Sequence, residues 1–441
     1  MMPPEEYQGS AAWRVVVAVA VAALTGLVSL VRYELFRSGT SLPYYVQALH
    51  ALAERGPWAV SSWSGQPILG LHGPLILLPM AYVMAFGGLG LVLVLQAVAV
   101  GIGFVYLDDW LVAEAVPWPR RRIVGWAYLM STLLWGMVAQ DLHPVVLAVP
   151  ALMAAATLLD RRRVAAGLVA LTAGLLCGYT VLPVALLLGL VLALRHQPTA
   201  GAAAALWAVA AALVARSATG VGLSGLLGLP SHPFSVAAAG SHALLYLGYL
   251  LAPVLVFGVS RGTVWLVPAL GVMALNLWVG TAAATSPFAV GSAMAAPFLL
   301  MALAATVADG RFLRWSRLSL AVYVLMFIVF LGHEAGLRHD GPPVGQLTAV
   351  ADALAVVPPH APVVAVPYTA AHLADRGEVL PFITAKVWPR GSYVVVDSTY
   401  TASIPAGALP PVLARLKREA KIKYAYEGMW VFYLPHQERG L

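Results

Sequence analysis

The sequence predicts a polytopic α-helical membrane protein that carries a small C-terminal α/β domain. Hydrophobic residues make up 61% of the 441-residue chain, charged residues make up only 10%, and the mean hydropathy is +0.83. A soluble domain typically has about 25% charged residues. The charges are also unevenly placed, because residues 335–441 hold 18 of the 45 Lys, Arg, Asp and Glu residues. This shift in composition predicts two domains, at 1–334 and 335–441.

The composition excludes several classes of protein. A chain with so few ionised groups cannot cover a water-facing surface, which excludes a soluble globular protein. Its high hydrophobicity excludes intrinsic disorder. The single cysteine, Cys177, excludes a disulfide framework and a cysteine-based zinc site.

Apolar runs that fit membrane-spanning helices recur along residues 1–334. A helix that crosses the hydrocarbon layer needs about 20 apolar residues, and several of these runs are shorter. We expect about eleven spans, at 15–31, 90–107, 123–140, 144–159, 164–178, 181–194, 201–215, 243–259, 263–280, 287–307 and 317–333.

Arginines in alternate loops predict the orientation. Every second loop carries arginine: the triplets at 120–122 and 161–163, Arg195, Arg261 and a cluster at 311–317. Short cytoplasmic loops are rich in Lys and Arg. The N-terminus is then cytoplasmic, and both the loop at 32–89 and residues 335–441 are extracytoplasmic, as in a multi-pass plasma (inner) membrane protein. The same count makes 72–86 a juxtamembrane or re-entrant helix.

This placement also explains the basic pI near 9.5. The basic residues flank membrane spans, so we expect a lipid bilayer as partner and no nucleic acid. The N-terminal stretch does not read as a cleavable signal, because it begins with Glu5 and Glu6 and lacks a small-residue cleavage site.

The C-terminal residues alternate between helix and strand patterns. We predict helices at 344–357, 368–376 and 408–420, strands at 362–366 and 391–397, and a closing hairpin of 421–426 with 429–434 that turns on Glu427-Gly428.

Asp141 and His143 are the leading candidates for chemistry, because ionisable groups at membrane depth are costly and are often functional. They stand where the span 123–140 emerges on the outer side. The two side chains could act as a base and its polar partner, or as two ligands of a metal ion. Alternatively, Asp141 is the N-cap of a helix that starts near Pro144.

Other polar residues face the same side. His72 opens the predicted juxtamembrane helix, and Tyr179 lies in an outer turn; both also fit plain structural roles. Charged residues lie along an amphipathic stretch at 43–54, which we expect on the outer leaflet. Of these, Arg37 and Arg55 are candidates for contacting a lipid phosphate. Asp108-Asp109 reads as a cytoplasmic flank.

Several motifs together resemble the domain of unknown function 2079 family of predicted membrane proteins, which belongs to the GT-C glycosyltransferase superfamily. His72-Gly73-Pro74 resembles the family's His-x-x-Pro, and Leu91 to Gln96 resembles its Leu-x-x-x-Gln. Asp141-Leu142-His143-Pro144 resembles its Asp-Phe-His-Pro and is the most specific match. In the C-terminal part the matches are 357–363, 372–376 and 393–397. The resemblance runs over most of the chain, from about 30 to 435.

The resemblance implies a GT-C-like fold and a sugar donor carried on polyprenyl phosphate. It also implies one catalytic carboxylate in the first outer loop and a second after the third span. Asp141 fits the second. The first is missing, because Ser41 and Val46 stand where the family has acids, although Gln47 is retained, and Gly178-Tyr179 replaces a Lys-Glu pair. General-base help is worth roughly 10²–10⁴-fold in rate, so these losses argue against ordinary catalysis.

Two functions from different classes follow. The first is a GT-C-like glycosyltransferase that uses a polyprenyl-phosphate-linked sugar at the outer face, with a degenerate site of Asp141, His143 and His72 as catalytic candidates and Ser41, Gln47, Arg37, Arg55 and Tyr179 as substrate or lipid contacts. The second is a non-catalytic scaffold or lipid-binding subunit of an envelope assembly, with 335–441 as the surface for a protein partner. A transporter is a weaker third hypothesis, because few polar residues lie at mid-membrane. The sequence does not define a cofactor; a divalent cation is possible but nothing indicates one.

Overall fold

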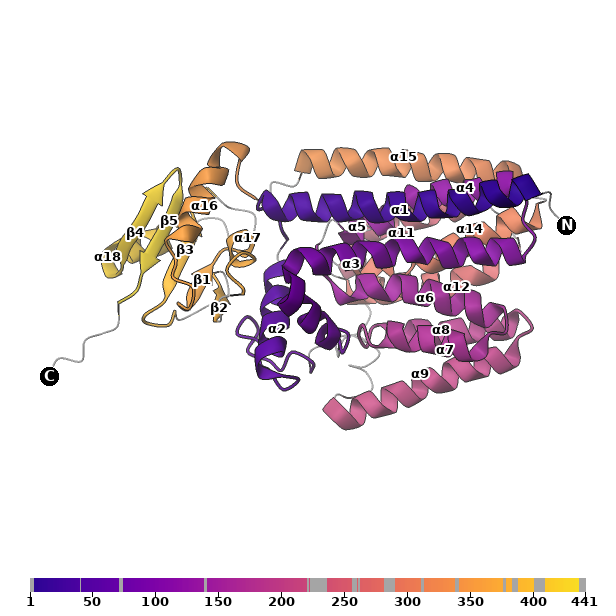
Figure 1. Ribbon diagram of the computed structural model, residues 1–441, viewed down its shortest axis with the longest axis horizontal. Coiled ribbons are helices and arrows are strands. Elements are labelled where there is room, and N and C mark those ends of the chain that lie inside the picture. The colour runs from indigo at the N-terminus through magenta and orange to yellow at the C-terminus, as the bar shows by residue number, and fades with distance from the viewer. Residues whose placement is uncertain are drawn as a thin grey trace.

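The computed structural model describes residues 4–39, 41–70, 74–138, 141–219, 222, 236–255, 260, 262–280, 290–310, 313–337, 341–375, 378–382, 388–399 and 409–435. It consists of a helical bundle and a C-terminal lobe, which we define as the described residues of 341–435. Figure 1 shows the lobe at one end of the bundle and the N-terminus at the other end.

The bundle contains helices that fit a multi-pass membrane protein. Among the described residues, five helices are long and apolar enough to cross a membrane, and further apolar helices are shorter. The long ones belong to α1 (Pro4–Glu34), α3 (Leu77–Ala113), α9 (Pro198–Thr219), α14 (Ala296–Asp309) and α15 (Leu313–Leu337). The shorter ones are α6 (Pro144–Asp160), α7 (Val164–Leu175), α8 (Val181–Leu194), α11 (Val236–Leu255) and α12 (Leu266–Val279), the last preceded by η1 (Thr263–Trp265). The count of eleven spans stays a prediction.

Three predicted segments differ from the structure. The span expected at 287–307 is broken into α13 (Val290–Ala293) and α14. The span expected at 123–140 is broken into α4 (Trp118–Leu129) and α5 (Thr132–Val138), and Trp135 Nε1 donates a hydrogen bond to the Leu129 carbonyl that the break releases (2.7 Å). The helix expected at 72–86 begins at Leu77 and continues into the next span through a kink at Gly88, where φ is 71° and ψ is −179°. Only glycine adopts that conformation without strain.

Small residues let the bundle helices approach closely. A Cβ atom on Gly101 of α3 would lie 2.5 Å from the Ala18 carbonyl oxygen of α1, and one on Gly201 of α9 would lie 2.5 Å from the Gly189 carbonyl oxygen of α8. Backbone contacts of this kind are the usual way in which membrane helices pack. The largest core cluster forms around them and includes Trp110, Tyr128, Trp265 and most of α14, with α13 (Val290–Ala293) beside it.

The lobe is a five-stranded mixed sheet with the strand order β2-β1-β3-β5-β4. β1 (Val363–Ala365) pairs in parallel with β2 (Val379–Pro381) and β3 (Tyr393–Asp397), whereas β5 (Met429–Tyr433) is antiparallel to β3 and to β4 (Lys421–Tyr426). The helices are α16 (Leu347–Ala355), preceded by η2 (Val344–Gln346), α17 (Pro367–Ala370) and α18 (Leu409–Glu419).

Most of the predicted lobe pattern appears in the structure. The predicted strands appear, as do the helix near 344–357, the helix near 408–420 and the hairpin, whose turn has positive φ at Glu427 (45°) and Gly428 (84°). The helix predicted at 368–376 is wrong in length, because α17 is a single turn, and the short strand β2 was not predicted.

The lobe packs on the loop region that follows α1. The ring of His372 stacks on Tyr33 with 4.1 Å between centroids and lies 4.3 Å from Phe36. Ser62 Oγ donates to the Val379 carbonyl of β2 at 3.0 Å. Ala371 and Ala374 share a core with α2 (Ser41–Arg55), nine of whose residues are buried. The helix expected on the outer leaflet therefore lies between the lobe and α3.

His372 makes this docking sensitive to acid. Burial lowers the pKa of His372 from 6.5 to about 4. Between these two pH values, His372 is protonated in the undocked chain and neutral in the docked chain. Docking should therefore be strongest above pH 6.5 and weaken as the pH falls toward 4, by at most roughly 3 kcal/mol at about 1.4 kcal/mol per pH unit. Thermal unfolding between pH 7 and pH 4 measures it. A His372→Phe variant should lose this dependence, and an unchanged slope in the variant would contradict the assignment.

Candidate functional site

Asp141 occupies a buried position in the segment between α5 and α6. Its side chain is 1% exposed, and its backbone has a φ of 67°, which is uncommon outside glycine. Oδ2 accepts a hydrogen bond from the Gly39 N–H at 2.6 Å, and Oδ1 lies 3.6 Å from Arg32 Nε. The carboxylate therefore ties the end of α1 and the first loop to the start of α6.

His143 is the N-cap of α6, so the alternative that gave this role to Asp141 is wrong. His143 has the extended backbone that an N-cap needs (φ −151°, ψ 130°), and its Nδ1 accepts from the Val145 N–H at 3.3 Å. A neutral ring that accepts at Nδ1 carries its proton on Nε2, so Nε2 donates to the Tyr45 hydroxyl oxygen at 3.0 Å.

Gln96 of α3 connects the two residues. Its Nε2 donates to the Asp141 carbonyl oxygen at 3.0 Å, and its Oε1 accepts from the His143 N–H at 3.3 Å. We call this set the Asp141 network: Arg32, Gly39, Tyr45, Gln96, Asp141 and His143. Arg32 and Tyr45 were not predicted as members. Gln96 carried a signal, because it is a lone amide in an otherwise apolar run.

Of the other predicted site residues, three lie in α2 and Arg37 lies between α1 and α2. Gln47 is fully buried and its Oε1 accepts from Ser61 Oγ at 2.8 Å. Ser41 is the first residue of α2 and is partly buried, Arg37 is partly buried, and Arg55 is exposed at the end of α2. His72 lies outside the described residues.

Tyr179 lies instead on an apolar groove of about 690 Å³. Residues within 57–70 and 75–78 form one side of the groove, and α7, α8 and α9 form the other. Trp58 and Trp207 line it and are 86% and 44% exposed. Leu78 lines the groove and also packs on the core that contains Leu142, so the groove wall and the Asp141 segment share one core.

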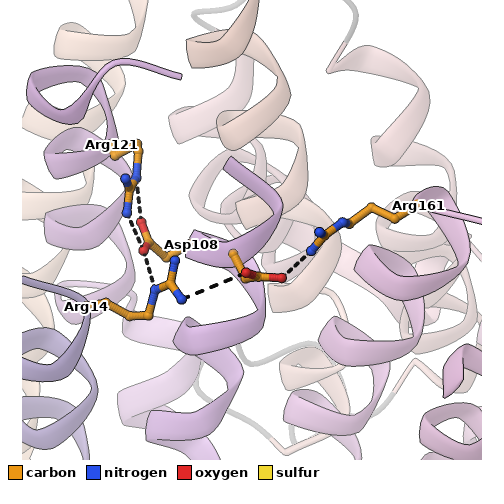
Figure 2. Close-up of polar contacts among 5 residues, drawn as sticks. Arg14, Asp108, Arg121 and Arg161 are labelled. Atoms are coloured by element: carbon orange, nitrogen blue, oxygen red, sulfur yellow. Dashed lines mark hydrogen bonds and ion pairs between the residues drawn. The ribbon is translucent and has the colours of Figure 1, made fainter. Parts of the chain in front are cut away.

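A second polar cluster lies at the opposite end of the bundle, where the sequence indicated only a cytoplasmic flank. Asp108 is fully buried and pairs with Arg121, which is 1% exposed, and with Arg14 Nε at 2.7 Å. Arg14 Nη1 also lies 3.8 Å from Asp109 Oδ1, and Asp109 pairs in turn with Arg161. Figure 2 shows Arg14, Arg121 and Arg161 around this cluster with Asp108. The flank interpretation is therefore wrong for Asp108, because this carboxylate holds α1, α3 and α4 together.

The same end carries a further ion pair. Asp160 at the end of α6 accepts from Arg195 Nε at 2.7 Å and from Trp110 Nε1 at 2.8 Å. Arginines from the loops at 120–122, 161–163 and 195 thus gather around one end of the bundle. Among the described residues, no group of three His, Cys, Asp or Glu side chains is placed to hold a metal ion.

The bundle with its lobe has an ArnT-like fold in a multi-pass membrane protein. The crystal structure of ArnT from Cupriavidus metallidurans in the apo state matches with a TM-score of 0.58 over 95% of this chain and 97% of that chain. The identity is 12%, so this likeness concerns the fold alone. The chain belongs to the family described as predicted membrane protein (DUF2079), whose model matches residues 32–406. No curated protein matches it.

Proposed function

We propose that this protein binds a polyprenyl-phosphate-linked sugar at the outer face of the membrane and acts as a GT-C-like glycosyltransferase. The observation that carries the proposal is the apolar groove of about 690 Å³ beside the core that holds the Asp141 segment. A polyprenyl chain is apolar and needs such a surface, since each buried CH₂ contributes about 0.8 kcal/mol.

The Asp141 network supports a positioning role in this function. Its carboxylate is 1% exposed and already accepts from Gly39, so the carboxylate holds neighbouring elements and does not itself contact the sugar. The network as a whole fixes α1, α2 and α3 against the start of α6, through the contacts of Arg32, Tyr45 and Gln96. The groove residues within 57–70, with Leu75, lie between α2 and α3 in the chain, so their position depends on these contacts.

A matched pair of α9 variants tests the groove. Ala210 and Ala202 are both exposed alanines of α9, but only Ala210 lines the groove. Ala210→Trp should fill the groove and weaken binding of polyprenyl phosphate by about tenfold or more, since displacing two buried CH₂ groups already costs about 1.6 kcal/mol. Ala202→Trp should leave binding unchanged. Native mass spectrometry of the detergent-solubilised protein with polyprenyl phosphate measures both, and equal affinities would contradict the groove assignment.

Non-catalytic lipid binding, as a subunit of an envelope assembly, is the second candidate function. One observation favours it: no exposed carboxylate is found at the positions compared with the family's acids. Ser41, Val46 and Tyr179 are not acids, and Asp141 is buried. Lipid binding by the wild type without any release of sugar from a polyprenyl-phosphate donor would select this function over transfer.

A further inference from the structure

A polar cavity of about 320 Å³, separate from the apolar groove, lies where α2, the kinked start of α3 and the lobe meet. Tyr33, His50 and Asp375 provide its polar lining, and Met84 and Ala85 belong to its accessible apolar wall. Pockets with a few converging polar groups on an apolar wall are the usual form of small-molecule sites.

The polar groups of this cavity mainly accept hydrogen bonds. The carboxylate of Asp375, an exposed residue, is an acceptor only. His50 Nε2 lies 3.2 Å from Glu54 Oε1, so the neutral ring donates there and keeps Nδ1 as an acceptor. The Tyr33 hydroxyl is the one group on this wall that can donate. A ligand that satisfies these groups must therefore present several O–H or N–H donors.

The charge of the cavity argues against an anion. Asp375 lines it, Glu54 borders it through His50, and like charges repel strongly where solvent is partly excluded. The phosphate of a lipid-linked sugar would therefore lie outside this cavity. The volume equals about ten water molecules at roughly 30 Å³ each, which is room for one sugar ring and too little for an oligosaccharide.

We propose that this cavity binds one monosaccharide unit without an anionic group, with its hydroxyl groups donating to Asp375 and His50 and its C–H face against Met84 and Ala85. The proposal rests on the proposed function, because the sugar is the one carried by the lipid. Two elements join the cavity to the Asp141 network: α1 supplies Arg32 to the network and Tyr33 to the cavity, and α2 supplies Tyr45 to the network and His50 to the cavity.

Cysteine protection tests the cavity in the full-length protein. Ala53 lines the cavity and is exposed, whereas Ala425 is exposed on β4 away from it. The native Cys177 is buried. We would label Ala53→Cys and Ala425→Cys proteins with a maleimide in the presence of a panel of methyl glycosides. At ten times its Kd, a bound glycoside should slow labelling of Ala53→Cys about tenfold and leave Ala425→Cys unaffected.

The variants and a second probe separate the outcomes. Adding Asp375→Asn to Ala53→Cys should weaken the protecting glycoside about tenfold, since a bond to a charged group is lost. Protection by no glycoside, or equal protection by inorganic phosphate, would overturn the monosaccharide assignment. If polyprenyl phosphate still distinguishes Ala210→Trp from Ala202→Trp in that case, the proposed function survives and only the cavity proposal fails.

Discussion

Asp108→Ala should strongly destabilise the folded protein. The substitution leaves Arg121, which is 1% exposed, and Arg14 without the carboxylate that both contact. Removing one partner of a buried ion pair typically costs 3–5 kcal/mol, so we expect a loss of about 4 kcal/mol in the free energy of unfolding. Thermal unfolding of the detergent-solubilised protein measures the loss.

Two further variants make this result specific. Asp352→Ala removes an exposed carboxylate on α16 and should change stability by no more than about 0.5 kcal/mol. The double variant Asp108→Ala/Arg121→Met should recover part of the loss, because apolar residues often replace a buried ion pair at little cost. If Asp108→Ala unfolds no more easily than Asp352→Ala, the cluster in Figure 2 does not stabilise the bundle.

Asp141→Asn should produce the second large effect, on sugar transfer. Asparagine keeps the size of the side chain but removes the charge that faces Arg32, and one acceptor oxygen becomes a donor nitrogen. A small displacement of the elements that the network positions can cost about 10²-fold in rate. We therefore expect release of sugar from a polyprenyl-phosphate donor to fall about 10²-fold.

The matched control for this variant is Asp352→Asn, which makes the same chemical change at an exposed position in the lobe. It should retain the wild-type rate. Equal rates in the wild type and in Asp141→Asn would remove Asp141 from the transfer function.

Hydropathy and strand patterning were sufficient to predict most helices and strands, because each depends on a local period. The β4–β5 hairpin is an example, since Glu427-Gly428 accepts the positive φ that its turn requires. Shorter or broken elements escaped prediction. β2 is three residues long and ends in Pro381, and the break between α4 and α5 is stabilised by Trp135, which lies beyond it.

The side-chain networks depended on distant partners that spacing does not reveal. Asp108 reads as a flank until Arg14, 94 residues away, is placed beside it. The sequence indicated a shared polar site at Asp141 and His143, but its N-cap alternative named Asp141, whereas the N-cap is His143. The backbone decides this, because φ at Asp141 is positive while His143 is extended. The contact of His143 with Tyr45 links residues 98 apart.

The proposed function requires that the lobe lie outside the cell and the arginine-rich end of the bundle inside. Two exposed alanines report on these ends: Ala425 on β4 and Ala165 at the start of α7, next to the arginines at 161–163. In intact cells stripped of outer barriers, a membrane-impermeant maleimide should label Ala425→Cys at once and Ala165→Cys only after lysis. Labelling of Ala165→Cys before lysis, with Ala425→Cys protected, would place the groove and the Asp141 network on the cytoplasmic side and contradict sugar transfer at the outer face.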